Sequence, residues 1–126
     1  MTEPLGPQVQ LVKRYFDEVV NGGNRELIPE LWSDPGAVGR GMEKIRQLRD
    51  AFPDLRLEVE RYEHVGEFVI AYFVGNGTHT GSLMGRPPTG KSIRFEGSNI
   101  YRVRDGKLAA AWGHLNTQDA FRELFK

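Results

Sequence analysis

The last of the three histidines, His114, has the neighbours best suited to chemistry. It shares one face of a predicted strand with Trp112 and Asn116, because alternate residues of a strand point to the same side. A histidine beside an indole in a pocket could act as a general base or acid near neutral pH. The alternative is a solvent-facing histidine near the end of a strand.

His79 is the second candidate for catalysis. It stands between Thr78 and Thr80, where an apolar strand gives way to a loop rich in Gly and Pro. Its ring nitrogens could either brace that loop or take part in the reaction. His64 lies next to a predicted turn, and we expect it to be solvated.

Several kinds of chemistry lack the residues they need. The chain has no cysteine, which excludes disulfides, thiolate metal sites and a thiol nucleophile. No His-x-His or Glu-x-x-His spacing predicts a metal site, and no glycine pattern opens a helix as nucleotide-binding loops do. The 17 basic and 17 acidic residues cancel, so nothing indicates nucleic acid as a partner. We therefore expect no metal and no bound cofactor.

Hydrophobic periodicity predicts the helices that come first in the chain. A spacing of 3.6 residues predicts a helix over 9–20, a short helix from Asn24 to Trp32, and a third helix over 42–52. Proline and three glycines predict a loop over 33–41. No segment is long and apolar enough to span a membrane, and the start of the chain is polar. We therefore expect a cytoplasmic protein without a membrane partner.

From residue 55 onward the period changes to two, which predicts strands. They are expected at 55–60, 68–74, 92–103 and 108–115, followed by a short helix that ends at Phe125. Asp105-Gly106 is a strong signal for a tight hairpin between the last two strands. The pattern predicts a single α+β domain over 1–126, with helices covering one face of an antiparallel sheet.

The hairpin that contains His79 also carries a family resemblance. Gly77-Thr78-His79-Thr80-Gly81 and the following Gly85-Arg86-Pro87-Pro88-Thr89-Gly90 resemble the SnoaL-like polyketide cyclases of the nuclear-transport-factor-2-like superfamily. Residues 51–55, 104–108 and Trp112 match that family too. The resemblance implies a cone-shaped, strongly curved, mostly antiparallel sheet, with N-terminal helices covering its concave face and a pocket between them. It also implies a homodimer formed through the outer face of the sheet.

The chain departs from the family pattern at positions that usually carry ionisable groups. Asn116 stands where the ester cyclases have the aspartate that takes a proton from the substrate, and Ala110-Ala111 replaces a Glu-His pair. Asn99 and Tyr72 stand where an aspartate and an arginine are common. An amide cannot accept a proton, but it can donate a hydrogen bond to an enolate oxygen. We therefore expect a more apolar pocket than that of a standard ester cyclase.

The leading hypothesis is an enzyme of secondary metabolism, a polyketide cyclase-like or isomerase-like protein that transfers a proton on an apolar carbonyl compound. His114 would be the base or acid, with His79 as the other candidate, and Asn116 and Tyr101 would hold the developing oxyanion. The ligand is expected to be a small apolar or polycyclic molecule. Its contacts are predicted to be Trp112, Tyr101, Tyr72, Asn99, Phe95 and Phe16.

Two alternatives stay open. The chain could be a non-catalytic ligand-binding or partner-binding domain that kept the cone and lost the family's acid, or a relative that assists hydroxylation. The enzyme is favoured if His114 or His79 points into an enclosed cavity with a hydrogen-bond partner, and the binding domain is favoured if both histidines face solvent. The loop over 84–90, stiffened by two prolines, is expected at the pocket mouth or against a partner subunit.

Overall fold

The computed structural model describes residues 6–126, with residue 40 described by its backbone alone. Within these residues, four strands form one antiparallel sheet, and each strand is hydrogen-bonded to the next along the chain. The strands are β1 (Arg56–Val65), β2 (Phe68–Thr78), β3 (Ser92–Arg104) and β4 (Lys107–Asn116).

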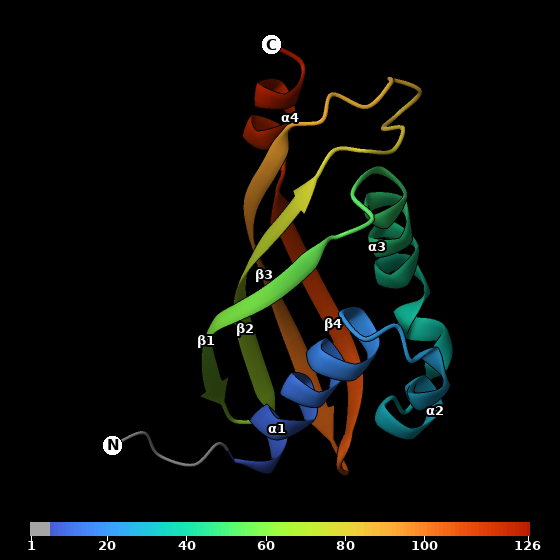
Figure 1. Cartoon of the computed structure of the whole chain (residues 1–126). Helices are drawn as coiled ribbons and strands as arrows, with labels where there is room; N and C mark the ends of the chain where they lie inside the picture. The colour runs from blue at the N-terminus through green and yellow to red at the C-terminus, as the bar shows by residue number, and fades with distance from the viewer. Residues whose placement is uncertain (1–5) are drawn as a thin grey trace.

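The helices lie mostly before the sheet in the sequence. They are α1 (Pro7–Arg14), a π-helical segment (Tyr15–Val20), a 3₁₀ turn (Arg25–Leu27), α2 (Ile28–Leu31), a 3₁₀ turn (Pro35–Val38), α3 (Gly39–Ala51) and the closing α4 (Gln118–Leu124). Figure 1 shows α1, α2 and α3 on one side of the sheet, and α4 beside the loop that joins β2 to β3. The predicted α+β fold, with N-terminal helices on an antiparallel sheet, is confirmed.

The first helix changes its winding at Tyr15. The amide of Asn21 donates to the carbonyl of Phe16 at 2.8 Å, which spans one residue more than an α-helical bond. This wider turn brings Tyr15 and Phe16 into the core together with Val19 and Val20. Two adjacent aromatic residues therefore reach the sheet from one turn of helix.

The inner face of the sheet, which the helices cover, is formed by alternate residues of each strand. Phe73 on β2 and Phe95 and Tyr101 on β3 are each 2% exposed, whereas Ile100 on the opposite face is 38% exposed. Phe16 packs against both Phe73 and Tyr101, with ring centroids 5.6 and 6.1 Å away. The core therefore lies between this inner face and the N-terminal helices.

A bulge in β4 decides which side chains of that strand reach the inner face. Val103 pairs with Leu108 and Arg102 pairs with Ala110, so Ala109 is an extra residue in the register. The alternation shifts by one residue after it. The residues beyond the bulge that face the helices are Ala111, Gly113 and Leu115, and those on the outer face are Trp112, His114 and Asn116.

Candidate active site

A cavity of about 630 Å³ lies between the inner face of the sheet and the segment from Pro35 to Leu48. Aromatic rings form much of its wall: Tyr15, Phe16, Trp32, Phe73, Phe95 and Tyr101. Ala111, Gly113 and Leu115 of β4 complete one side, and Lys44 and Asn99 add polar side chains. Its size and mostly apolar lining fit a small organic ligand.

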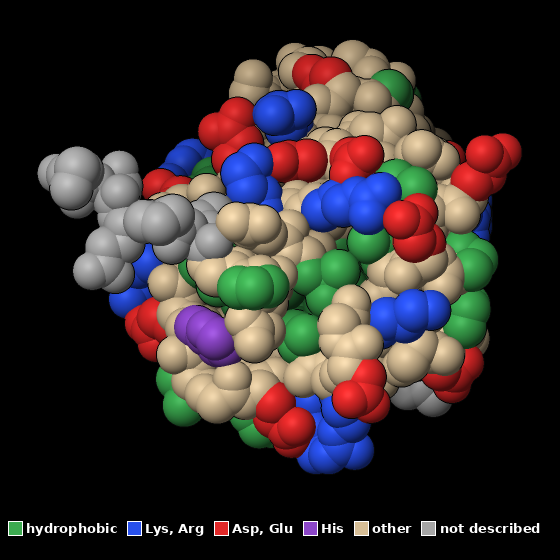
Figure 2. Space-filling view, turned by 90° about the horizontal axis from the view of Figure 1, so that it is seen from below, with side chains coloured by type: hydrophobic (Ala, Val, Ile, Leu, Met, Phe, Trp, Pro, Cys, Tyr) green, Lys and Arg blue, Asp and Glu red, His purple; other side chains and the backbone are tan. Residues whose placement is uncertain are grey.

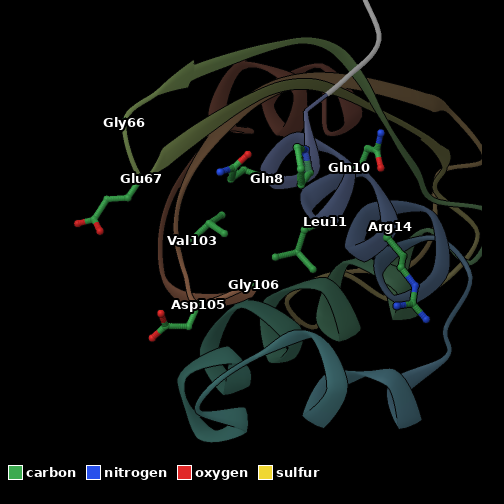
Figure 3. A pocket seen from close by; sticks show the side chains of 10 residues that line it. Gln8, Gln10, Leu11, Arg14, Gly66, Glu67, Val103, Asp105 and Gly106 are labelled. Carbon is green, nitrogen blue, oxygen red and sulfur yellow. The ribbon is translucent and has the colours of Figure 1, made fainter.

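A second hollow of about 510 Å³ lies between the start of α1 and the turns at residues 66–67 and 105–106. Figure 2 looks onto this end of the molecule, where hydrophobic side chains show between acidic and basic ones. In Figure 3 the side chains of Leu11 and Val103 point into the hollow, whereas Glu67 and Asp105 extend away from it. Glu67 is bound by Arg102 and Arg104, which lower the pKa of its carboxyl. With few polar groups directed inward, this hollow is the weaker candidate.

The two polar side chains of β3 in the larger cavity are hydrogen-bonded to each other. Asn99 donates from Nδ2 to the hydroxyl oxygen of Tyr101 at 2.9 Å. Burial raises the pKa of the Tyr101 phenol well above its ordinary value, so the hydroxyl stays neutral. Because its oxygen already accepts from Asn99, the phenol is left as a donor toward a ligand oxygen. Tyr101 can therefore hold an oxyanion but cannot serve as a base.

Gly113 makes room for the amide of Asn99. The two residues face each other across β3 and β4, and a Cβ at position 113 would lie 2.4 Å from Asn99 Oδ1. No other amino acid fits there without moving the amide. The signal in the sequence that could have indicated this close approach of Gly113 to Asn99 is a glycine in the middle of a strand.

Trp32 and Lys44 are lining residues with polar groups that were not among the predicted site residues. The indole N–H of Trp32 is buried and has no acceptor among the described residues. Lys44, on α3, is an exposed residue that lines the cavity. In the sequence, Trp32 falls in a hydrophobic stripe and could not be told from a core residue. Lys44 falls on a polar helix face and could not be told from an ordinary surface residue.

The expectation that His114, Trp112 and Asn116 reach the cavity is wrong. All three lie on the outer face of the sheet, where His114 pairs with Ser98 and the ring of Trp112 lies 6.3 Å from that of Phe68. The physical reason is the bulge at Ala109, which moves the even-numbered residues of β4 away from the helices.

Tyr72 also lies outside the cavity, contrary to expectation. It is on the outer face of β2, where the guanidinium of Arg61 stacks 4.1 Å above its ring. Phe16, Phe95, Asn99 and Tyr101 do lie in the lining, as the sequence led us to expect. Their contact with a ligand remains a prediction.

His79 is fully buried beneath the loop that joins β2 to β3, and it does not line the cavity. Its Nδ1 lies 3.2 Å from the amide of Thr89, which donates to it, and its ring packs between Phe52 and Phe125. This geometry matches the loop-bracing alternative and gives no route to a cavity ligand. The catalytic expectation for His79 is therefore not supported by its position.

The loop itself packs away from the larger cavity. The carbonyl of Ala51 accepts from the amides of Thr80 and Gly81, and the guanidinium of Arg86 lies 4.5 Å from the ring centre of Phe125. No residue of 79–91 lines the cavity, so the expected place at its mouth is wrong. Packing of this loop on a partner subunit remains a prediction.

Neither metal ligands nor a membrane span emerge from the part of the chain that the structure describes. Between residues 6 and 126 no three carboxylate or imidazole groups gather as metal ligands would. No helix in that range is both long enough and apolar enough to cross a bilayer.

The sequence pattern of the SnoaL-like polyketide cyclases matches residues 10–124. The chain belongs to that family. Aklanonic acid methyl ester cyclase DauD of Streptomyces sp. (strain C5) is 34% identical over 118 residues, which cover 82% of this chain and 73% of DauD. Nogalonic acid methyl ester cyclase of Streptomyces nogalater is 42% identical over 71 residues, which cover 56% of this chain and 53% of that enzyme. Wild-type IdmH of Streptomyces antibioticus shares the fold with a TM-score of 0.77, at 25% identity over 94% of this chain and 99% of IdmH.

The polar groups in the lining of the cavity are few and are mainly hydrogen-bond donors. The described lining residues include no carboxylate and no imidazole. Hydrogen-bond donors are present in Tyr101 and Trp32, and an amide in Asn99. The arrangement is suited to stabilising negative charge on a ligand oxygen rather than to removing a proton.

Proposed function

We propose that this protein is a polyketide cyclase of secondary metabolism that closes a ring on a polycyclic substrate bound in the 630 Å³ cavity. Membership of the family and the two methyl ester cyclases among its relatives support the reaction class. The observation that carries the proposal is the Asn99–Tyr101 pair, a neutral, oriented donor in an apolar cavity.

The reaction would be an aldol-type ring closure. A carbon between two carbonyls loses a proton, and its enolate attacks a third carbonyl carbon elsewhere in the substrate. A C–C bond forms, the C=O π bond breaks, and that carbonyl oxygen becomes an alkoxide. The Tyr101 hydroxyl donates to this oxygen as its charge develops, with the phenol oriented by Asn99. The described lining holds no carboxylate or imidazole, so the carbon-bound proton passes to water at the mouth, and water returns one to the alkoxide.

The test is an assay of the purified protein with aklanonic acid methyl ester and nogalonic acid methyl ester. Chromatography and mass spectrometry should detect a product of unchanged mass with one more ring. A product that gains an oxygen atom would support the hydroxylation-assisting alternative instead. Saturable binding of either compound without any product would contradict the cyclase proposal.

A non-catalytic binding domain is the second candidate. Its support is the lack of a carboxylate or imidazole among the described lining residues, together with the positions of His79 and His114 outside the cavity. The same assay separates the two candidates, because a binding domain would retain the ligand unchanged.

We further propose that two copies associate through the outer face of the sheet. Val65 and Trp112 are 62% and 54% exposed there, beside Phe68 and Ile100. Exposed apolar side chains that gather in this way are typical of protein interfaces. The expected product of association is a homodimer.

A further inference from the structure

Lys44 supplies a positive charge to a cavity whose described lining contains no negative one. It lies on α3, where the nearby acidic residues are already engaged. Arg46 binds Glu43 at 2.6 Å and Asp50 at 3.1 Å. No carboxylate among the described residues lies within ion-pair distance of Lys44.

The lining of the cavity includes both deeply buried and exposed residues. Tyr101 and Trp32 are each 2% exposed, whereas Gly36, Ala37 and Gly41 near Lys44 are exposed. A ligand that fills the cavity would therefore contact the buried Tyr101 as well as the exposed Lys44.

Asp34, two residues before Gly36, is engaged within its own turn. Asp34 accepts a hydrogen bond from the amide of Gly36 at 3.0 Å and is not a lining residue. A neutral ligand would leave the ammonium without a partner. A ligand with an anionic oxygen would pair with it.

We propose that the ligand of this cavity carries an anionic oxygen, a carboxylate or an enolate on a flat aromatic skeleton, which pairs with Lys44 at the mouth. The inference rests on the proposed function, since it assigns the substrate class of the same cavity. It also separates this chain from its named relatives, whose substrates are methyl esters, because a free acid would bind better here than its ester.

The test compares two probes that differ by one charge, 1-hydroxy-2-naphthoate and its methyl ester. Calorimetric titration at low salt should give the wild-type protein a preference for the anion of about threefold to fivefold, the range expected for a partly exposed ion pair. Lys44→Gln should remove this preference, so that the two probes bind about equally well. Salt at about 1 M, where the Debye length is about 3 Å, should have the same effect.

Lys13→Gln is the matched control, since Lys13 is exposed on α1, binds Asp17 and does not line the cavity. It should keep the wild-type preference. If both probes bind and Lys44→Gln keeps the preference for the anion, the inference is wrong while the cavity proposal stands. If neither probe binds the wild-type protein, the inference is wrong, and the cyclase proposal is decided by the ring-closure assay alone.

Discussion

Asn99, Tyr101 and Gly113 form the smallest unit on which the proposed chemistry depends. The amide orients the phenol, and the glycine leaves space for the amide. Burial keeps the phenol protonated by raising its pKa, so it donates at any physiological pH. The proposed oxyanion donor therefore depends on all three residue types being present together.

Gly113→Ala tests this unit by adding a single methyl group. The new Cβ would fall 2.4 Å from Asn99 Oδ1, so the amide must turn and lose its bond to Tyr101. We expect a loss of about 1–3 kcal/mol in the free energy of unfolding, the usual cost of overpacking. Urea denaturation would measure it.

The control is the same Gly113→Ala substitution made in the Asn99→Ala variant, which lacks the Oδ1 atom that the new methyl group would contact. The cost of Gly113→Ala should be smaller in that background, and the difference is the coupling energy of the pair. Equal costs in both backgrounds would show that the close contact is not the reason for the glycine.

The order of the elements was predictable from the sequence, whereas their irregularities were not. Alternation located β1 to β4, and Asp105 and Gly106 form the expected tight turn, with φ of 53° and 75°. Ala109 is one of three consecutive alanines, so the alternation of apolar and polar residues in β4 did not identify it as the bulge. Because the strand period is two, that one residue moved His114 to the opposite face.

The candidate site was predictable only in part for the same reason. Phe95, Asn99 and Tyr101 lie on β3, whose alternation is regular over these positions, and they line the cavity. Tyr15 reaches it through the π-helical segment, which a period of 3.6 does not describe. Long-range contacts such as the pairing of His79 with Thr89 depend on loop geometry that local patterns do not encode.

Asp54, just before β1, is hydrogen-bonded to Thr78 at the end of β2. The stability that these bonds provide should depend on pH. Thr78 donates to Asp54 from its amide at 2.7 Å and from its hydroxyl at 2.9 Å, and these bonds lower the pKa of the carboxyl. The ionised Asp54 carboxyl stabilises the folded state at pH values above its unfolded-state pKa of about 4. This stabilisation is lost as the pH falls through the lower pKa that the carboxyl has in the folded state.

Asp54→Asn should therefore lose stability relative to the wild type at about pH 6, and the difference should shrink at about pH 3. Urea denaturation at the two pH values measures both quantities. Glu43, Glu67 and Glu123 also have lowered pKa values, so the wild type itself will weaken in acid, and only the difference between the proteins is informative. A difference that stays constant across this range would exclude a role for the Asp54 charge.

At the scale of the whole molecule, the two faces of the sheet have different roles. The inner face closes a cavity with the helices, and the outer face exposes Trp112 and Ile100 to solvent in the single chain. Covering the outer face in a dimer would bury these side chains without altering the cavity. His114 and Asn116, which we expected to be catalytic, would then lie at the subunit interface.

Light scattering should return a mass of about twice 14.3 kDa for the wild type. Trp112→Glu should shift the protein toward the monomer, because it places a charge in the apolar contact. Gln47→Glu is the control, since Gln47 is exposed on α3, on the side of the sheet that the helices cover. A wild-type mass near 14.3 kDa at micromolar concentration would contradict the dimer.

The central claim is that Tyr101, in the cavity, stabilises the oxyanion, and that His114, on the outer face, takes no part in the chemistry. The most direct measurement compares the turnover of Tyr101→Phe with that of His114→Ala on whichever methyl ester is cyclised, with circular dichroism to verify the fold of each. Tyr101→Phe should lower turnover by roughly 10²–10³-fold, the usual loss of an oxyanion donor, and His114→Ala should leave it nearly unchanged. The reverse result, with His114→Ala inactive and Tyr101→Phe active, would contradict the account.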